Sequence, residues 1–116
     1  MAFRKLKVWQ QAKALAVYIY KLTTQGDMLR DAGLRGQIQR AAVSIPSNIA
    51  EGDELDTDKQ AIRHFYIAKG SAAEVLTQSI IAFEIGYIDQ SQFTHIETEC
   101  IYISAMLQKL IHARSK

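Results

Sequence analysis

The stretch from Gly33 to Gly52 has the pattern of one long amphipathic helix, around which the rest of the chain is expected to fold. Its apolar residues recur at steps of three and four, which is the spacing of one helical face: Leu34, Ile38, Ala42, Ile45 and Ile49. A second stripe, about 120° around the same helix, is wholly polar: Gln37, Arg40, Ser44, Asn48 and Glu51.

Pro46 lies in the middle of this segment. A proline inside a helix removes one backbone hydrogen bond and clashes with the preceding turn, at a cost of about 3 kcal/mol. A new helix beginning at Pro46 would need Ile45 as its N-cap, and isoleucine is a poor cap. The apolar spacing also continues through the proline without a change of phase. The sequence therefore predicts a single helix that is kinked at Pro46.

The remaining residues predict three more helices. One proline and six glycines in 116 residues leave few obligatory turns and favour long helices over many short strands. The first helix is expected to begin near Leu6 or Lys7 and to end before a loop over residues 23–27. A polar loop over residues 52–58 precedes a third helix that reaches Gly86, and the fourth follows a cap at Asp89 or Ser91. We expect an all-α protein in which residues 1–116 form a single domain, an antiparallel up-and-down four-helix bundle.

Three details of the last two helices are expected to matter for packing. Ile80 falls in the apolar phase of the third helix. Gly70 and Ser71 lie in its middle, where a glycine is usually compensated by a close approach between helices. The fourth helix has more apolar residues than one stripe needs, and the extra flank is expected to face a partner subunit: Ile101, Met106 and Ile111.

No pattern for a metal, a cofactor or a catalytic centre is found. The three histidines, His64, His95 and His112, are far apart in sequence, and Cys100 is the only cysteine. Four nitrogen and sulfur ligands for zinc cannot be assembled from them. The acidic run from Glu51 to Asp58 lacks calcium-loop spacing, so a solvated, helix-capping loop is the better interpretation. We expect no enzymatic activity, unless a site forms between subunits.

Charge is distributed unevenly along the chain. The net charge is +2, but residues 1–50 contain eight Lys or Arg against two Asp or Glu. These basic residues either solvate two helices or contact phosphate groups. The possible nucleic-acid contacts are Arg4, Lys5, Lys7, Lys13, Arg35 and Arg40. No stretch approaches the ~20 apolar residues of a membrane span, and no cleavage site follows the basic start, so a cytoplasmic location is expected.

The polar stripe is the best candidate for a functional surface. Ser44 and Asn48 are mediocre helix formers, and a face that meets only solvent more often carries Glu or Lys. The pattern therefore favours hydrogen bonds between helices or between subunits, with Arg40 paired to Glu74. The predicted helix-packing or interface residues are Gln37, Arg40, Ser44, Pro46, Asn48, Glu51, Gly70, Ser71 and Glu74.

Several of these residues carry a resemblance to a known bacterial family. Residues 44–52 read Ser-Ile-Pro-Ser-Asn-Ile-Ala-Glu-Gly, and residues 65–71 read Phe-Tyr-Ile-Ala-Lys-Gly-Ser. With Gln37, Arg40 and Trp9, these segments resemble the four-helix-bundle proteins encoded in intervening sequences of bacterial 23S ribosomal RNA genes, which are also labelled S23 ribosomal proteins. The resemblance covers roughly residues 3–88.

The resemblance implies a bundle that assembles into a ring, with a homopentamer as the expected form, and no established enzymatic activity. It also implies a distant likeness to the accessory variability protein of diversity-generating retroelements, which binds a reverse transcriptase and nucleic acid. One departure matters, because the family usually has arginine and neutral residues after Glu51-Gly52, whereas this chain has Asp53-Glu54-Leu55-Asp56.

Two functional hypotheses follow. The first is a non-enzymatic, oligomeric interaction or scaffold protein that presents surfaces to a protein or nucleoprotein partner. The second is a protein that binds RNA or DNA directly through its N-terminal basic residues. The two differ in whether those residues converge on one face of the molecule.

Overall fold

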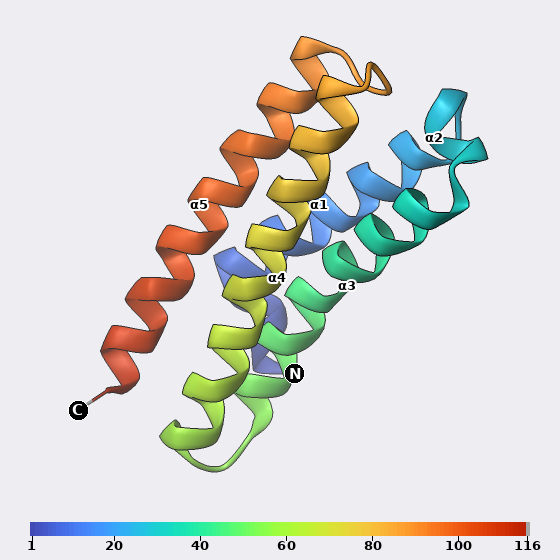
Figure 1. The fold of residues 1–116 in the computed structure, drawn as a ribbon. Helices are drawn as coiled ribbons and strands as arrows, with labels where there is room; N and C mark the ends of the chain where they lie inside the picture. Colours follow the sequence, from blue (N-terminus) through green and yellow to red (C-terminus); the bar gives the residue numbers. More distant parts are fainter. Residues whose placement is uncertain (116) are drawn as a thin grey trace.

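A computed structural model describes residues 1–115, and within them the secondary structure is entirely helical. The chain has four long helices, as the sequence predicts, and Figure 1 shows it running up and down through them. The elements in order are the 3-10 helix η1 (Ala2–Lys5) and the α-helices α1 (Lys7–Thr23), α2 (Gly26–Arg30), α3 (Ala32–Glu54), α4 (Asp58–Glu84) and α5 (Gln90–Arg114). Lys116, the last residue of the predicted domain, lies outside the described residues.

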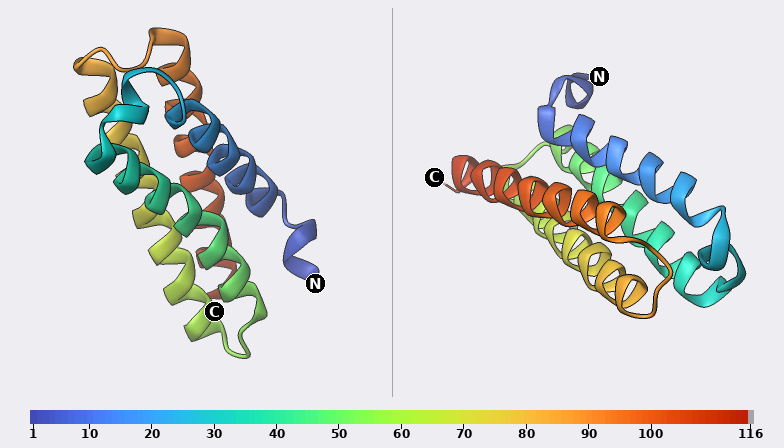
Figure 2. Two further views of the ribbon diagram at one scale, coloured as in Figure 1. Left: turned by 90° about the vertical axis from the view of Figure 1, so that its right-hand side faces the viewer. Right: turned by 90° about the horizontal axis from the view of Figure 1, so that it is seen from above.

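The four long helices form an elongated bundle of 45 × 21 × 20 Å. Helix α3 packs against both α1 and α4, α4 packs against α5, and α5 completes the circuit against α1. The two views of Figure 2 show this circuit from the side and from above. As a result, the α1–α3 pair and the α4–α5 pair lie on opposite sides of the bundle, and the α3–α4 pair forms a side between them.

Helix α3 runs without interruption through Pro46, as the unbroken apolar spacing predicts. Four of the five residues of its apolar stripe are buried and the fifth, Leu34, packs at the edge of the core. The continuity of the helix is confirmed, and the bend at Pro46 stays a prediction.

Local signals in the sequence set most of the helix ends. The Asp31 carboxylate accepts from the backbone N–H of Leu34, which caps α3. Helix α5 begins with a capping box, in which Asp89 and Gln92 each bond the other's backbone N–H. Gly86, at φ 87°, ends α4 with bonds from its own N–H to Phe83 and from Tyr87 to Ala82.

Two predicted boundaries are wrong. The polar loop is shorter than residues 52–58, because α3 continues to Glu54 and Thr57 already caps α4. Residues 23–27 are not one loop, because α1 includes Thr23 and the short helix α2 begins at Gly26. In both places a tertiary contact accompanies the extension of a helix into residues without apolar periodicity: Gly52 is buried against α4, and the Thr23 hydroxyl accepts from the side-chain amide of Gln39 on α3.

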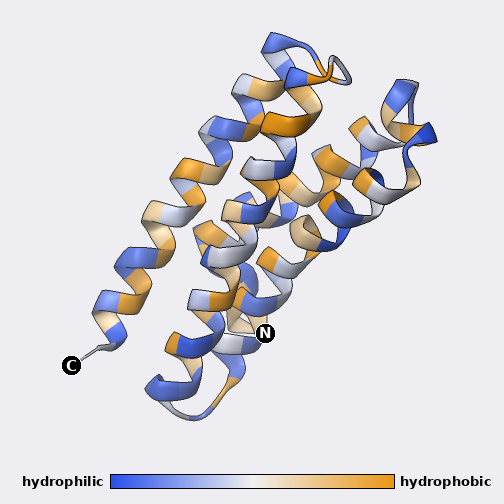
Figure 3. Ribbon diagram, in the orientation of Figure 1, coloured by the Kyte–Doolittle hydropathy of each residue, from blue (hydrophilic) through white to orange (hydrophobic). Residues whose placement is uncertain are grey.

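Hydrophobic and hydrophilic positions alternate along each long helix (Figure 3), so that each helix turns an apolar face inward. Two side chains differ from their predicted places. Ile111, expected on a surface flank, is buried in the core, because α5 is in contact with both α4 and α1. Ile80, expected in the core, is 38% exposed, and Val75 and Ala82 of the same helix are buried instead.

Candidate functional site

The polar stripe of α3 faces the groove between α3 and α4, and its two halves behave differently. Towards the C-terminal end of α3, Ser44 and Asn48 are half-buried and bond to side chains of α4. Towards the N-terminal end, Gln37 and Arg40 are exposed along the wall of a cleft. The stripe therefore combines a fastened half with an open half.

In the fastened half, four side chains form a continuous hydrogen-bond chain, and Glu51 contacts the histidine at its end. Ser71 Oγ donates to Ser44 Oγ at 2.8 Å, and Asn48 Nδ2 donates to the same oxygen at 3.0 Å and to the Ser44 carbonyl at 2.9 Å. Asn48 Oδ1 lies 2.9 Å from His64 Nδ1, and His64 Nε2 lies 3.3 Å from Glu51 Oε2. Hydrogen bonds therefore join α3 to α4 at Ser44 and Asn48, whereas Glu51 makes only its contact with His64.

This chain assigns the tautomer of His64. The Ser44 carbonyl can only accept, so it must face the amide nitrogen of Asn48, which turns the Asn48 oxygen towards the histidine. His64 Nδ1 therefore carries a hydrogen. Its Nε2 then meets the Glu51 carboxylate, with which a protonated ring would form an ion pair.

In the open half, the predicted ion pair between Arg40 and Glu74 is not formed within 4.0 Å among residues 1–115. A Cβ added at Gly36 would lie 3.1 Å from an Arg40 guanidinium nitrogen, so the Arg40 side chain folds back along its own helix. The two charges instead line one cleft of about 320 Å³, here named the polar cleft. Its lining residues are Gln37, Arg40, Ala41, Ser44, Ser71, Glu74 and Gln78.

The sequence reasoning missed the two α4 residues that complete this region, His64 and Gln78. Gln78 had a usable signal, because Ser71, Glu74 and Gln78 are spaced three and four and so form a polar stripe on α4 that matches the one on α3. His64 had none, because only the antiparallel pairing of α3 and α4 brings it to Asn48 and Glu51.

The close helix approach predicted at Gly70 occurs elsewhere. Gly70 is exposed, and a Cβ placed on it would meet nothing within 4 Å. The close contact between α3 and α4 is at Gly52, where a Cβ would lie 2.8 Å from the Phe65 ring. Of the predicted small pair, Ser71 alone is buried, at the α3–α4 contact.

The predicted basic residues lie on three elements. Arg4 and Lys5 are on η1, and Lys7 begins α1. Lys13 lies further along α1, with its ammonium group 5.7 Å from the centre of the Trp9 ring. The remaining two are on α3, where Arg35 donates to the Leu29 carbonyl at the α2 end and Arg40 lines the polar cleft. The structure therefore gathers three of the six at the start of the chain and distributes the others along the bundle.

The acidic run that departs from the family pattern meets a cation of this chain. Arg114, near the end of α5, lies 3.5 Å from Asp53 and 3.5 Å from Asp58, with its guanidinium over the Phe65 ring. Asp53 is largely buried in this contact. Part of the acidic run therefore fastens α5 to the α3–α4 turn.

Cys100 and His95, from which the sequence predicts no zinc site, lie in packed surroundings. Burial raises the pKa of the Cys100 thiol to about 12, which keeps it protonated at neutral pH. His95 packs against the Tyr18 ring at 4.4 Å between ring centres. Within residues 1–115, no group of three or more histidine, cysteine or acidic side chains is arranged to hold a metal ion. No helix in the same range is long and apolar enough to span a membrane.

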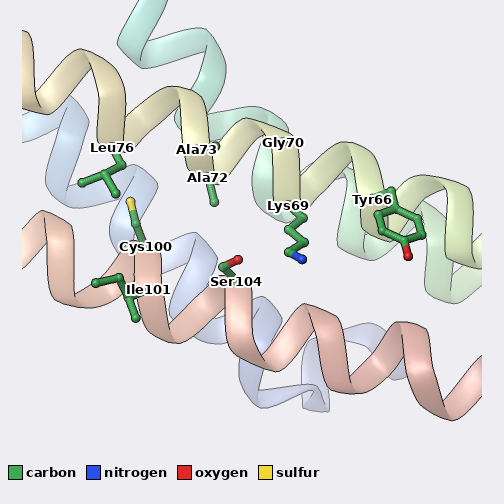
Figure 4. Close-up of a pocket in the computed structure, with 9 residues that line it drawn as sticks. All are labelled: Tyr66, Lys69, Gly70, Ala72, Ala73, Leu76, Cys100, Ile101 and Ser104. Carbon is green, nitrogen blue, oxygen red and sulfur yellow. The ribbon is translucent and has the colours of Figure 1, made fainter.

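Two apolar grooves lie on opposite sides of the bundle. Figure 4 shows the first, of about 560 Å³, between α4 and α5, where Tyr66 and Ile101 border a floor of small residues that includes Gly70 and Ala73. The second, of about 400 Å³, lies between α1 and α3. Its exposed apolar members are Val17, Tyr20 and Val43, and Pro46 also lines it. Ile101, which the sequence assigned to a partner-facing flank, is 58% exposed.

Comparison with known proteins agrees with this architecture. A crystal structure of a protein of unknown function from the S23 ribosomal protein family of Bacteroides thetaiotaomicron superposes with a TM-score of 0.82 at 24% sequence identity, covering 90% of this chain and 97% of that one. No curated protein matches the chain. The family model described as 23S rRNA-intervening sequence protein matches residues 4–109. The chain therefore belongs to the 23S rRNA-intervening sequence protein family.

Proposed function

We propose that this protein is a non-enzymatic interaction module that assembles with copies of itself and presents the assembled surface to a protein or nucleoprotein partner. The observation that carries the proposal is the pair of apolar grooves on opposite sides of one bundle. Exposed apolar surface of this kind marks interaction sites rather than a solvated face.

The positions of the grooves favour one mode of assembly. If the α4–α5 groove of one copy packs on the α1–α3 groove of the next, the row of copies keeps one free groove of each kind, at its two ends, until it closes. Such head-to-tail contacts generate rings when the rotation closes. The family resemblance favours a ring of five.

The candidate chemistry supports a binding role. The Cys100 thiol is buried and protonated, and the His64 chain is used to fasten α3 to α4. The residues of the polar stripe on α3 therefore either contact side chains of α4 or line the polar cleft.

Molar mass in solution tests the assembly. The wild-type protein is expected to exceed its 13.1 kDa monomer mass in light scattering coupled to size exclusion. Val17→Asp and Ile101→Asp, each placing a charge in a different groove, are expected to shift it towards the monomer because a desolvated, unpaired carboxylate opposes the contact. Leu29→Asp is the matched control, because Leu29 is also exposed but lines neither groove. A monomeric wild type, or groove variants that assemble like the control, would refute the proposal.

A direct RNA- or DNA-binding role is the second candidate, favoured by the three exposed cations Arg4, Lys5 and Lys7 at the start of the chain. Labelled structured RNA and duplex DNA would be titrated at several salt concentrations. Binding through several phosphates should weaken linearly with salt on logarithmic axes, and Lys5→Gln and Lys7→Gln should lower the slope by about one each. The absence of binding at low salt would remove this candidate and leave the assembly proposal intact.

A further inference from the structure

The polar cleft lies on the α3–α4 side of the bundle and shares no lining residue with either apolar groove. Its floor is made of buried or half-buried residues, Ala41, Ser44, Ser71 and Gln78, and its rim of the exposed Gln37, Arg40 and Glu74. At about 320 Å³ it is near the lower end of small-molecule sites, which run from about 300 to 1,000 Å³.

The two charged residues of the rim come from different helices and have opposite signs. Arg40 belongs to α3 and Glu74 to α4, and neither takes part in an ion pair among residues 1–115. The cleft therefore presents a fork of guanidinium donors on one wall and a carboxylate on the other.

The floor contains a polar group without a partner. Gln78 is only 9% exposed, and its side-chain oxygen has no hydrogen-bond partner among the described residues. That oxygen is closed off from solvent, so it lies beneath the surface of the cleft. Ser44 Oγ also has capacity left, because it accepts from Asn48 and Ser71 and its own O–H remains available to donate.

We propose that the polar cleft binds a small zwitterion of the α-amino acid class. The carboxylate of the ligand bonds to the Arg40 guanidinium, which matches its geometry, and accepts from Ser44. The ammonium group of the ligand, which has only donors, bonds to the Glu74 carboxylate, which only accepts. A phosphate or nucleotide is a poorer match, because the Glu74 carboxylate would repel it.

Isothermal titration calorimetry with each standard amino acid tests the proposal, with N-acetylated and C-amidated forms of the best ligand as comparisons. We expect each blocked form to bind at least about ten-fold more weakly, because each removes one of the two charges. Arg40→Gln and Glu74→Gln are expected to have the same effect. Arg63→Gln and Glu84→Gln are the matched controls, because these residues are exposed on α4 and do not line the cleft.

Two results would overturn the proposal. The first is that no amino acid binds at concentrations up to about 10 mM, well above the ~1 mM Kd of a weak ligand. The second is a site that takes nucleotides or phosphate in preference to amino acids.

Discussion

At the scale of single residues, Gly52 and Gly70 show opposite reasons for a glycine inside a helix. Both lie within long helices, where glycine costs about 1 kcal/mol relative to alanine. At Gly52 an added Cβ would lie 2.8 Å from Phe65 Cε1 and 3.1 Å from His64 Cβ. At Gly70 the same atom would meet open space within the bundle. At Gly52 the lower helix propensity is therefore offset by a close contact between α3 and α4. At Gly70 no contact within one copy offsets it.

Substituting alanine at the two positions should accordingly change stability in opposite directions. Gly52→Ala is expected to lower the free energy of unfolding by about 1–3 kcal/mol, because the Phe65 ring and the α4 backbone must shift. Gly70→Ala is expected to raise it by about 0.5–1 kcal/mol. Urea unfolding at low protein concentration measures both. A Gly52→Ala protein as stable as the wild type would show that the α3–α4 contact adapts to the methyl group.

At the scale of secondary-structure elements, Asp31 connects the start of α3 to the turn between α4 and α5. One of its carboxylate oxygens caps α3 through the Leu34 N–H, and the other accepts from the Tyr87 hydroxyl at 3.0 Å. The Leu34 bond first, and then the Tyr87 bond, lower the pKa of the Asp31 carboxyl from its ordinary 3.8. The same contact raises the pKa of Tyr87.

The pKa shifts of Asp31 and Tyr87 predict that the free energy of unfolding is highest at intermediate pH and falls in both acid and alkali. The folded-state pKa of Asp31 lies below its unfolded value, so its contribution is present above about pH 3.9 and is lost as the pH falls through the folded pKa. The folded-state pKa of Tyr87 lies above its unfolded value, so its contribution is present below about pH 10 and is lost as the pH rises further. Thermal melts as a function of pH measure both effects.

Two variants test whether Asp31 causes the loss of stability in acid and Tyr87 the loss in alkali. Asp31→Asn keeps a good N-cap residue but removes the charge, so the acid loss should shrink relative to the wild type. Tyr87→Phe should remove the alkaline loss that Tyr87 contributes and leave the α3 cap in place. If the acid limb of the profile is the same in Asp31→Asn and in the wild type, Asp31 is not its source.

At the scale of the whole molecule, the bundle separates three surfaces of different character. The apolar grooves lie on the α1–α3 and α4–α5 sides, and the polar cleft lies on the α3–α4 side between them. This separation is possible because each long helix contacts two neighbours and still has an outward face.

Head-to-tail contact between the two grooves makes a specific prediction for mixtures. Val17→Asp blocks the α1–α3 groove and Ile101→Asp blocks the α4–α5 groove, so neither variant alone can pair its remaining groove with an intact complementary one. An equimolar mixture is expected to form a heterodimer of about twice the monomer mass, because one intact groove of each kind is then available. Native mass spectrometry with one variant isotopically labelled resolves this species. Homodimers of either variant alone would instead indicate that each groove pairs with itself.

Much of the fold could be read from local sequence signals. The apolar stripe of α3, the caps at Asp31, Thr57 and Asp89 and the glycine at residue 86 act within a few residues of chain, so their effect follows from spacing and side-chain chemistry alone. The same local logic failed where distant packing decided the outcome, as for the extension of α3 to Glu54 and the burial of Ile111.

In the candidate site, too, local sequence signals predicted some features and distant packing decided others. The sequence predicted partners for the polar face of α3 from Ser44 and Asn48, because both are mediocre helix formers and are less common than Glu or Lys on an exposed helix face. The partner of Asn48 and Glu51 is a histidine of α4, and the ion pair expected between Arg40 and Glu74 is replaced by an open cleft.

By itself, the sequence determined that this chain forms four long amphipathic helices, where most of them end, and to which family it belongs. Each of these depends on the repeat of the helix and on motifs within one segment. Only the tertiary structure decided that His64 meets Asn48, that Gln78 is buried without a partner and that the grooves lie on opposite sides. The reason is physical: side-chain spacing fixes the face of a helix on which a residue lies, but the register and order in which helices pack fix what that face meets.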